Sequence, residues 1–109
     1  MAPGAVSPEN DEMQPALTDP ERLLVKEIVH RVVPEADFRI FGSRATGRAR
    51  PFSDLDLLVI KPERLSWEQR AALRDAFEAS DLPYMVDVVE AAALPAGMAE
   101  RVRREMLTL

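Results

Sequence analysis

The chain has 109 residues, of which 47% are hydrophobic, which is enough for one compact domain with a modest two-layer core and makes a second folded domain unexpected. It contains no cysteine, which excludes a disulfide framework and a thiolate metal site. No apolar run approaches the roughly 18 residues of a membrane span, and the N-terminus lacks the basic and apolar regions of a signal peptide, so we expect a cytoplasmic protein. The formal net charge of −5 argues against broad binding to nucleic acid, although a small basic cluster could still hold a phosphate group.

Residues 1–17 are rich in Pro, Ala, Glu and Asn and have no apolar periodicity, so we expect a disordered leader followed by one folded domain at 18–109. The segment 18–21 carries two helix-start signals, a cap at Asp19 and a capping box formed by the first and last residues of the segment. An apolar face follows at helical spacing, and Pro34 ends the predicted helix.

The rest of the chain alternates between short strands and helices. The predicted elements are a strand at 38–41, a short helix or turn with a loop at 42–53, a strand at 54–60, a helix from 67 to about 80, a strand at 84–89 and a last helix after Pro95. The strand at 54–60 ends in four apolar residues, which is typical of a central strand covered on both faces. This order predicts an α/β (α+β) fold in which a small sheet is flanked by helices.

Three acidic residues stand where strand geometry can bring them together. Asp54 and Asp56 project from the same face of their strand because strand side chains alternate. Carboxylates this close repel each other unless a cation lies between them, which indicates a hard divalent metal such as Mg²⁺. Asp87 stands between valines, where burying an unpaired carboxylate is unfavourable unless it joins the same metal site. Three carboxylates can hold two ions, one activating the attacking oxygen and one binding a triphosphate and its leaving pyrophosphate, while Asp87 deprotonates or coordinates an acceptor hydroxyl.

A second group of residues is suited to holding phosphate. Gly42 lets the backbone approach a phosphate closely, and the hydroxyl of Ser43 can donate to its oxygens together with amides at the start of a short helix. Arg44, Arg48 and Arg50 follow at once, and we expect at least one of them, with Arg44 as the candidate, to neutralise triphosphate charge. A solvated basic loop is the alternative interpretation of these arginines.

The sequence resembles the nucleotidyltransferase superfamily that includes DNA polymerase β in a combination of three motifs. They are Gly42-Ser43, the pair Asp54 and Asp56 after ten intervening residues, and Asp87. The resemblance is to its minimal nucleotidyltransferase branch, often paired with HEPN-domain RNase toxins, and it covers nearly the whole predicted domain. It implies a small mixed β-sheet, ATP as nucleotide donor and Mg²⁺ as cofactor. In members paired with a HEPN toxin, it implies antitoxin activity by transfer of AMP to a toxin tyrosine. We expect no extra C-terminal domain of the kind with which larger relatives bind antibiotics or RNA, which argues against those substrates.

Simpler interpretations stay open for individual residues. An Asp-x-Asp pair alone can be a solvated strand edge, Asp87 can be the structural partner of an arginine, and Ser43 can be a turn or helix cap. His30 is best interpreted as a surface or partly packed residue, and Trp67 and Tyr84 as packing or interface residues.

Three functions are compatible with the sequence. The first is transfer of AMP from ATP to a hydroxyl of a partner protein, a HEPN-type toxin. The second is a binding module that masks the toxin without catalysis. The third is transfer to a small molecule such as an aminoglycoside. Because so short a chain can hardly enclose both a triphosphate and an acceptor, we expect a partner protein or a second copy of the chain to supply one wall of the cleft.

Overall fold

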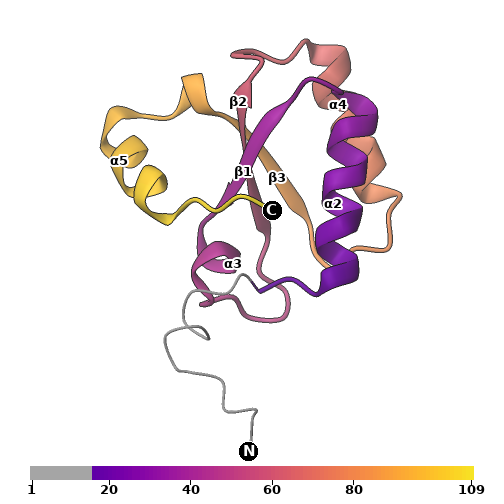
Figure 1. Ribbon diagram of the computed structural model, residues 1–109, viewed down its shortest axis with the longest axis horizontal. Coiled ribbons are helices and arrows are strands. Elements are labelled where there is room, and N and C mark those ends of the chain that lie inside the picture. The colour runs from indigo at the N-terminus through magenta and orange to yellow at the C-terminus, as the bar shows by residue number, and fades with distance from the viewer. Residues whose placement is uncertain (1–15) are drawn as a thin grey trace, which may run out of the picture.

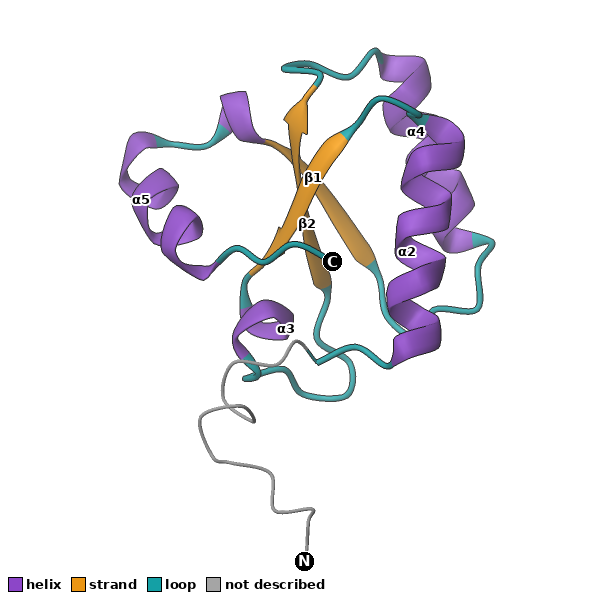
Figure 2. Ribbon diagram, viewed as in Figure 1, coloured by secondary structure: helices purple, strands orange, loops and turns teal. Residues whose placement is uncertain are grey.

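The computed structural model describes residues 16–109, and three strands within them form one mixed sheet (Figure 2). The strands are β1 (Asp37–Phe41), β2 (Leu55–Lys61) and β3 (Val86–Glu90), in the spatial order β1-β2-β3. β1 pairs with β2 antiparallel, and β2 pairs with β3 parallel. The apolar strand β2 is therefore central, which confirms the prediction from its four consecutive apolar residues.

Helices cover both faces of this sheet (Figure 1). α2 (Asp19–Val32) and α4 (Trp67–Glu78) pack side by side on one face, and α5 (Ala96–Glu105) lies on the other. The short helix α3 (Ser43–Thr46) follows β1, and the 3₁₀ turn η2 (Ala91–Ala93) joins β3 to α5. The predicted α+β arrangement of a small mixed sheet flanked by helices is confirmed.

The two longest helices, α2 and α4, both begin with a capping box. At α2, the Thr18 hydroxyl accepts from the Glu21 amide at 3.2 Å, and the Glu21 carboxylate accepts from the Thr18 amide at 3.0 Å. Of the two signals in the sequence, the capping box is the one used. Ser66 and Gln69 form the same reciprocal pair at the start of α4. Each box satisfies two amides that the helix itself leaves without partners.

The core consists of two apolar clusters, one on each face of the sheet. Leu55, Leu57 and Val59 of β2 face α2 and α4, whereas Leu58 faces α5 and contacts a cluster that includes Val102. All five side chains are almost completely buried. Because alternate residues of β2 serve opposite clusters, Asp56 belongs to the face of the sheet that α5 partly covers.

Several element boundaries differ from the predicted ones, and β2 begins at Leu55 and not at Asp54. Ala16 and Leu17, assigned to the leader from sequence, are part of the described fold: Ala16 donates its amide to the Arg44 carbonyl at 2.7 Å, and Leu17 packs against the core. The other predicted leader residues lie outside the described range. β3 begins two residues later than predicted because Tyr84 packs its ring into the interior before the strand starts. The apolar spacing of the last helix predicts that it includes residues 106 and 107, but α5 ends at Glu105, and Leu107 forms an antiparallel bridge with Ile40 of β1.

Within residues 16–109, none of the helices has both the length and the apolar character needed to cross a lipid bilayer.

Candidate active site

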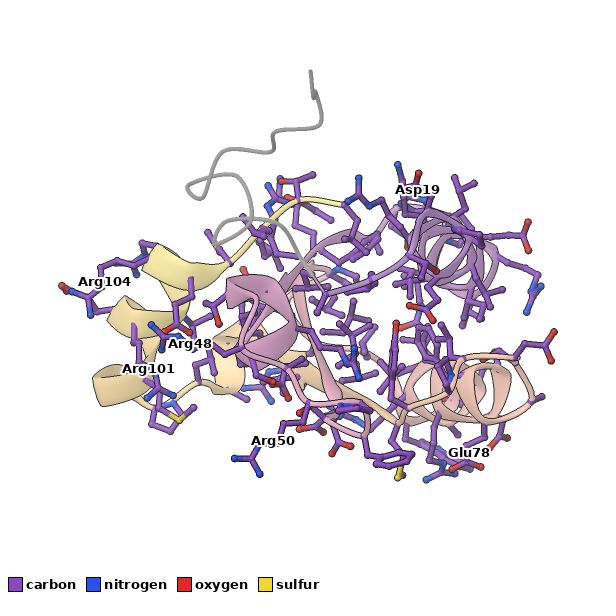
Figure 3. The ribbon with its side chains drawn as sticks, turned by 90° about the horizontal axis from the view of Figure 1, so that it is seen from below. Asp19, Arg48, Arg50, Glu78, Arg101 and Arg104 are labelled. Carbon is purple, nitrogen blue, oxygen red and sulfur yellow. The ribbon has the colours of Figure 1, made fainter. Side chains whose placement is uncertain are left out.

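The antiparallel pairing of β1 brings the candidate site residues to one end of the sheet. Gly42 and Ser43 come directly after β1 ends, whereas Asp54 comes directly before β2 begins. Asp56 and Asp87 are each the second residue of their strands. Since the end of an antiparallel strand meets the start of its neighbour, these residues gather beside α3, at the end of the sheet from which Figure 3 is viewed.

Asp54, Asp56 and Asp87, here called the acidic cluster, lie close enough to influence one another. Asp56 and Asp87 are registered partners on adjacent parallel strands, so their side chains project from the same face. The pKa of Asp56 is raised, first by burial and then by the negative charges of Asp87 and Asp54. The structure thus brings together the three carboxylates singled out from the sequence, while their catalytic roles stay a prediction.

Burial is distributed differently from what the sequence indicated. We expected Asp87 to be the residue for which burial is unfavourable, because it stands between valines. Instead β3 is an edge strand, and Asp87 is exposed, whereas Asp56 on the central strand is half-buried and has the raised pKa. The flanking valines are only partly buried, so an apolar neighbourhood in sequence did not imply a buried carboxylate.

The acidic cluster has the donor chemistry of a divalent-cation site. Carboxylate oxygens are the ligands that hard divalent cations prefer, and a bound cation would remove the repulsion that raises the pKa of Asp56. Among residues 16–109, however, no three acidic or histidine side chains are already arranged to hold an ion. The cluster therefore fits a metal in the chemistry of its side chains, which would have to turn toward an ion to coordinate it together.

Gly42 is the point of contact between the phosphate-binding candidates and the acidic cluster. Its φ of +79° lies in the region that favours glycine, and a Cβ atom at this position would overlap the carboxylate of Asp56. The backbone at the start of α3 therefore lies directly against one of the three carboxylates. Negative phosphate next to carboxylate is unfavourable unless a cation bridges them, so the contact supports the pairing of a metal with a phosphate group.

Arg44 is placed differently from the exposed phosphate ligand predicted from the sequence. Its side chain is buried, with 5% of its surface exposed. The guanidinium donates from Nε to the Ser53 carbonyl at 2.8 Å and from Nη1 to the Ala16 carbonyl at 2.8 Å. Nη2 donates to the carbonyls of Pro51 at 3.0 Å and Arg50 at 3.2 Å. These contacts direct all three nitrogens of Arg44 toward the backbone and do not favour a triphosphate contact.

Arg48 and Arg50 have exposed side chains, and Arg50 extends away from the body of the protein (Figure 3). Arg48 also lines a hollow of about 530 Å³ together with Arg104 of α5. Of the three arginines near Ser43, these two therefore remain available to contact a charged ligand.

Tyr84 completes the surroundings of Arg44 and is a packed residue, as expected. Its ring lies 3.7 Å from the guanidinium carbon of Arg44, and its hydroxyl donates to the Glu21 carboxylate at 3.1 Å. Burial and the negative charge of Glu21 raise the pKa of the Tyr84 hydroxyl. The sequence carried no signal for this arrangement, because most partners of Arg44 are backbone carbonyls.

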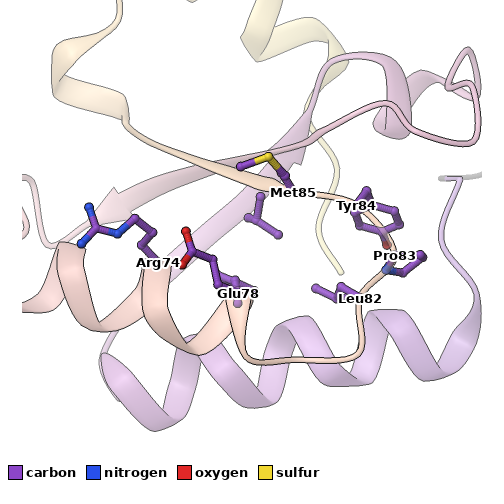
Figure 4. A pocket seen from close by; sticks show the side chains of 8 residues that line it. Arg74, Glu78, Leu82, Pro83, Tyr84 and Met85 are labelled. Carbon is purple, nitrogen blue, oxygen red and sulfur yellow. The ribbon is translucent and has the colours of Figure 1, made fainter.

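A second hollow of about 420 Å³ lies between the end of α4 and the segment that enters β3 (Figure 4). It is lined by Arg74, Glu78 and Tyr84 among others, and Met85 at its rim is 67% exposed. Neither of these two hollows is lined by the acidic cluster. The carboxylates of Asp54, Asp56 and Asp87 therefore lie outside both hollows.

Comparison with known proteins identifies the class to which this fold and site belong. The nucleotidyltransferase domain family matches residues 22–107, which is most of the chain. The chain therefore belongs to the nucleotidyltransferase family, and it is an enzyme of that class. Such enzymes generally use a nucleoside triphosphate and divalent metal ions.

Two relatives narrow the assignment to the minimal branch predicted from the motifs. The chain is 39% identical over 84 residues to the probable protein adenylyltransferase MntA of Haemophilus influenzae, an alignment that covers 77% of this chain and 74% of the relative. It also matches a solved structure provisionally assigned as a minimal nucleotidyltransferase, with a TM-score of 0.66 and 38% identity. That match covers 81% of this chain and 88% of the solved chain. The predicted resemblance is confirmed.

Proposed function

We propose that this enzyme transfers AMP from ATP to a hydroxyl group of a partner protein, and that the partner is a toxin of the HEPN-type RNase class. The close contact between Gly42 and Asp56 is the observation that carries the proposal, since it would set a metal-binding carboxylate beside a phosphate-binding backbone. The similarity to a relative named as a probable protein adenylyltransferase supports a protein acceptor.

In the proposed reaction, the acidic cluster would hold two Mg²⁺ ions, which would supply charge neutralisation for the triphosphate and for the pyrophosphate that leaves. The Ser43 hydroxyl and the backbone after Gly42 donate hydrogen bonds to phosphate oxygens. The acceptor oxygen forms a bond to the α-phosphorus as the bond from that phosphorus to the pyrophosphate oxygen breaks. Asp87, the most exposed strand carboxylate of the cluster, takes the proton of the acceptor hydroxyl.

An acceptor protein is also consistent with exposed apolar side chains near the acidic cluster. Phe52 is 87% exposed and lies two residues before Asp54, while Met85 is 67% exposed and lies two residues before Asp87. The Leu55 amide donates to the Met85 carbonyl at 2.8 Å, so the two chain segments that carry these side chains are adjacent. We propose that the acceptor protein covers this surface and supplies the missing wall of the cleft.

The direct test uses labelled ATP, Mg²⁺ and the product of the adjacent gene. We expect label on that product with the wild-type chain and none with an Asp54→Asn, Asp56→Asn double variant. Asp75→Asn is a matched control, because its side chain is 72% exposed on α4, away from the cluster. Chelation of metal should stop the transfer, and Mg²⁺ should restore it. Equal labelling by the double variant would reject the mechanism.

The masking function predicted as an alternative gives a different result in cells. If the chain neutralises a toxin by contact alone, the double variant should protect as well as the wild type. If transfer is required, the double variant should fail to protect while Asp75→Asn protects fully. Transfer to a small molecule predicts drug resistance from this chain alone, which a panel of aminoglycosides would reveal.

A further inference from the structure

The three chain segments that carry the candidate site residues all meet at one buried side chain, that of Arg44. Arg44 itself belongs to α3, directly after Ser43. Its guanidinium contacts the segment 50–53 that leads into Asp54, and it lies against the ring of Tyr84, three residues before Asp87. Each segment therefore enters the site from a contact with the same planar group.

The segment 50–53 is a turn built around this group. Its own hydrogen bonds run from the Ser53 amide to the Arg50 carbonyl at 3.0 Å and from the Arg50 amide to the Ser53 hydroxyl at 2.9 Å. Three carbonyls of the turn, those of Arg50, Pro51 and Ser53, accept from the Arg44 guanidinium. The Ser53 carbonyl lies on the peptide bond to Asp54, so the guanidinium holds the peptide from which that carboxylate projects.

The segment before Asp87 is fixed from two sides. The Tyr84 ring stacks on the guanidinium of Arg44, and the next carbonyl, that of Met85, accepts from the Leu55 amide at the start of β2. A displacement of the Tyr84 ring would thus move the residues that set the spacing between Asp87 and the start of β2.

No other side chain can replace these contacts. A planar guanidinium offers five N–H donors in a fixed fork and a flat face for stacking, whereas a lysine ammonium is a single point with three donors. The buried charge of Arg44 is compensated here by four backbone carbonyls and one aromatic ring. Loss of the fork would leave several of those carbonyls without partners.

We propose that Arg44 is a positioning residue of this enzyme: it fixes the distances within the acidic cluster and between the cluster and the Gly42-Ser43 turn, and it does not bind the triphosphate. The effect on turnover rests on the proposed function, whereas the effect on site geometry does not. The two parts are therefore tested by separate measurements.

Site geometry is tested by amide hydrogen exchange and by ¹⁵N chemical shifts in Arg44→Lys, with Arg48→Lys as the matched control. Arg48 is exposed and lies four residues after Arg44. Its substitution makes the same change of side chain and leaves the net charge unchanged. We expect at least about tenfold faster exchange of the Leu55 amide in Arg44→Lys, with shift changes at Gly42, Asp54 and Asp87. The control should leave them unchanged. Exchange and shifts equal to those of the wild type would overturn the proposal.

Turnover and nucleotide binding separate positioning from ligation. For Arg44→Lys we expect kcat to fall by roughly 10- to 100-fold, because small misplacements of catalytic groups have effects of that size. The Kd for ATP with Mg²⁺, measured by calorimetry, should change by less than about threefold, since a positioning role removes no direct contact with the nucleotide. A tenfold weaker Kd with unchanged kcat would identify Arg44 as a triphosphate ligand and reject the proposal. If the wild type transfers no AMP, the proposed function fails, and the exchange measurement still decides the role of Arg44.

A second pair of variants covers the case in which Arg44→Lys does not fold. Tyr84→Leu removes the stacked ring and leaves the carbonyl contacts in place, whereas Tyr84→Phe keeps the ring and removes only the hydroxyl bond to Glu21. We expect faster exchange of the Leu55 amide in Tyr84→Leu and near wild-type exchange in Tyr84→Phe. Identical behaviour of the two variants would contradict a role of the stacked guanidinium in holding this segment.

Discussion

Replacing Asp56 with asparagine should stabilise the protein in the absence of metal and abolish its activity. Asp56 is half-buried and lies beside two other carboxylates, which together with burial raise its pKa. Asparagine has nearly the same shape without the charge. The substitution therefore removes both the repulsion and the unfavourable burial of a charged group, and it also removes one of the proposed metal ligands.

The size of the expected stabilisation follows from the distance between the charges of Asp56 and Asp87. Asp56 and Asp87 are registered neighbours, and adjacent strands lie about 4.8 Å apart. Two unit charges at that separation repel by roughly 0.9 kcal/mol in bulk water, and by more where solvent is partly excluded. Because Asp87 is exposed, its repulsion of Asp56 is near the value for water. Burial, the largest cause of the raised pKa, adds to this repulsion, and Asp54 contributes less than Asp87. The expected gain in the free energy of unfolding is about 1 to 2 kcal/mol, and each kcal/mol corresponds to a rise in Tm of about 4 to 8 °C for a domain of this size.

The gain in the free energy of unfolding on replacing Asp56 should increase as the pH rises. Because the folded-state pKa of Asp56 is raised above its usual value of 3.8, the folded protein holds this proton more tightly than the unfolded chain does. The destabilising effect of Asp56 is therefore absent below pH 3.8 and develops fully as the pH rises through the raised pKa. The wild type and the Asp56→Asn variant should converge in stability at the acid end of this window and diverge above it.

Urea denaturation in EDTA, at several pH values, measures this difference. Asp75→Asn is the control for net charge, and its stability should stay within about 0.5 kcal/mol of the wild type. Adding Mg²⁺ should stabilise the wild type more than Asp56→Asn and so reduce the gap. A variant no more stable than the wild type at neutral pH, or an equal gain from Asp75→Asn, would refute the electrostatic reasoning.

Three further predictions concern single side chains. Gly42→Ala should abolish transfer and lower the free energy of unfolding by more than Gly47→Ala, for which the left-handed φ of +77° predicts a loss of about 1 to 2 kcal/mol. Urea denaturation ranks the two variants, because the alanine at position 42 also places a Cβ against the carboxylate of Asp56. Phe52→Ser should raise KM for the protein acceptor several-fold without changing the Kd for ATP, while Trp67→Ser, an exposed aromatic at the opposite end of the sheet, should change neither. Thr18→Ala should cost about 1 kcal/mol of stability by removing the cap of α2, and equal thermal unfolding of this variant and the wild type would contradict a role of the capping box.

Much of the fold follows from local sequence signals. The capping boxes at Thr18 and Ser66 determine where α2 and α4 begin, and the apolar run of β2 indicates a central strand before any pairing is known. These signals are reliable because they depend on neighbouring residues only. The sheet order and the antiparallel direction of β1 depend on long-range pairing, and the sequence alone carried no equivalent signal for them.

The candidate site was predictable in its acidic residues and less so in its arginines. The spacing of Asp54 and Asp56 projects them from one face of an extended chain, so they lie close together although β2 begins at Leu55 and Asp54 stands just before it. The burial of Arg44 depends on where the carbonyls of Ala16 and the turn 50–53 lie, and every residue type presents the same carbonyl. A sequence carries no signal for the positions of these backbone carbonyls. An arginine beside a phosphate-binding motif was therefore interpreted as a phosphate ligand.

The mixed sheet has a consequence for the order in which the enzyme acquires its parts as it folds. β1 and β2 are joined by the short connection 42–54, whereas β3 reaches β2 only after the longer crossover 62–85, which contains α4. Closing the longer connection loses more conformational entropy, so we expect the β1–β2 pair to form earlier. A chain at that stage would possess the Gly-Ser turn and two aspartates but lack the third. Catalytic competence would therefore arise only after the crossover has docked and β3 has paired with β2.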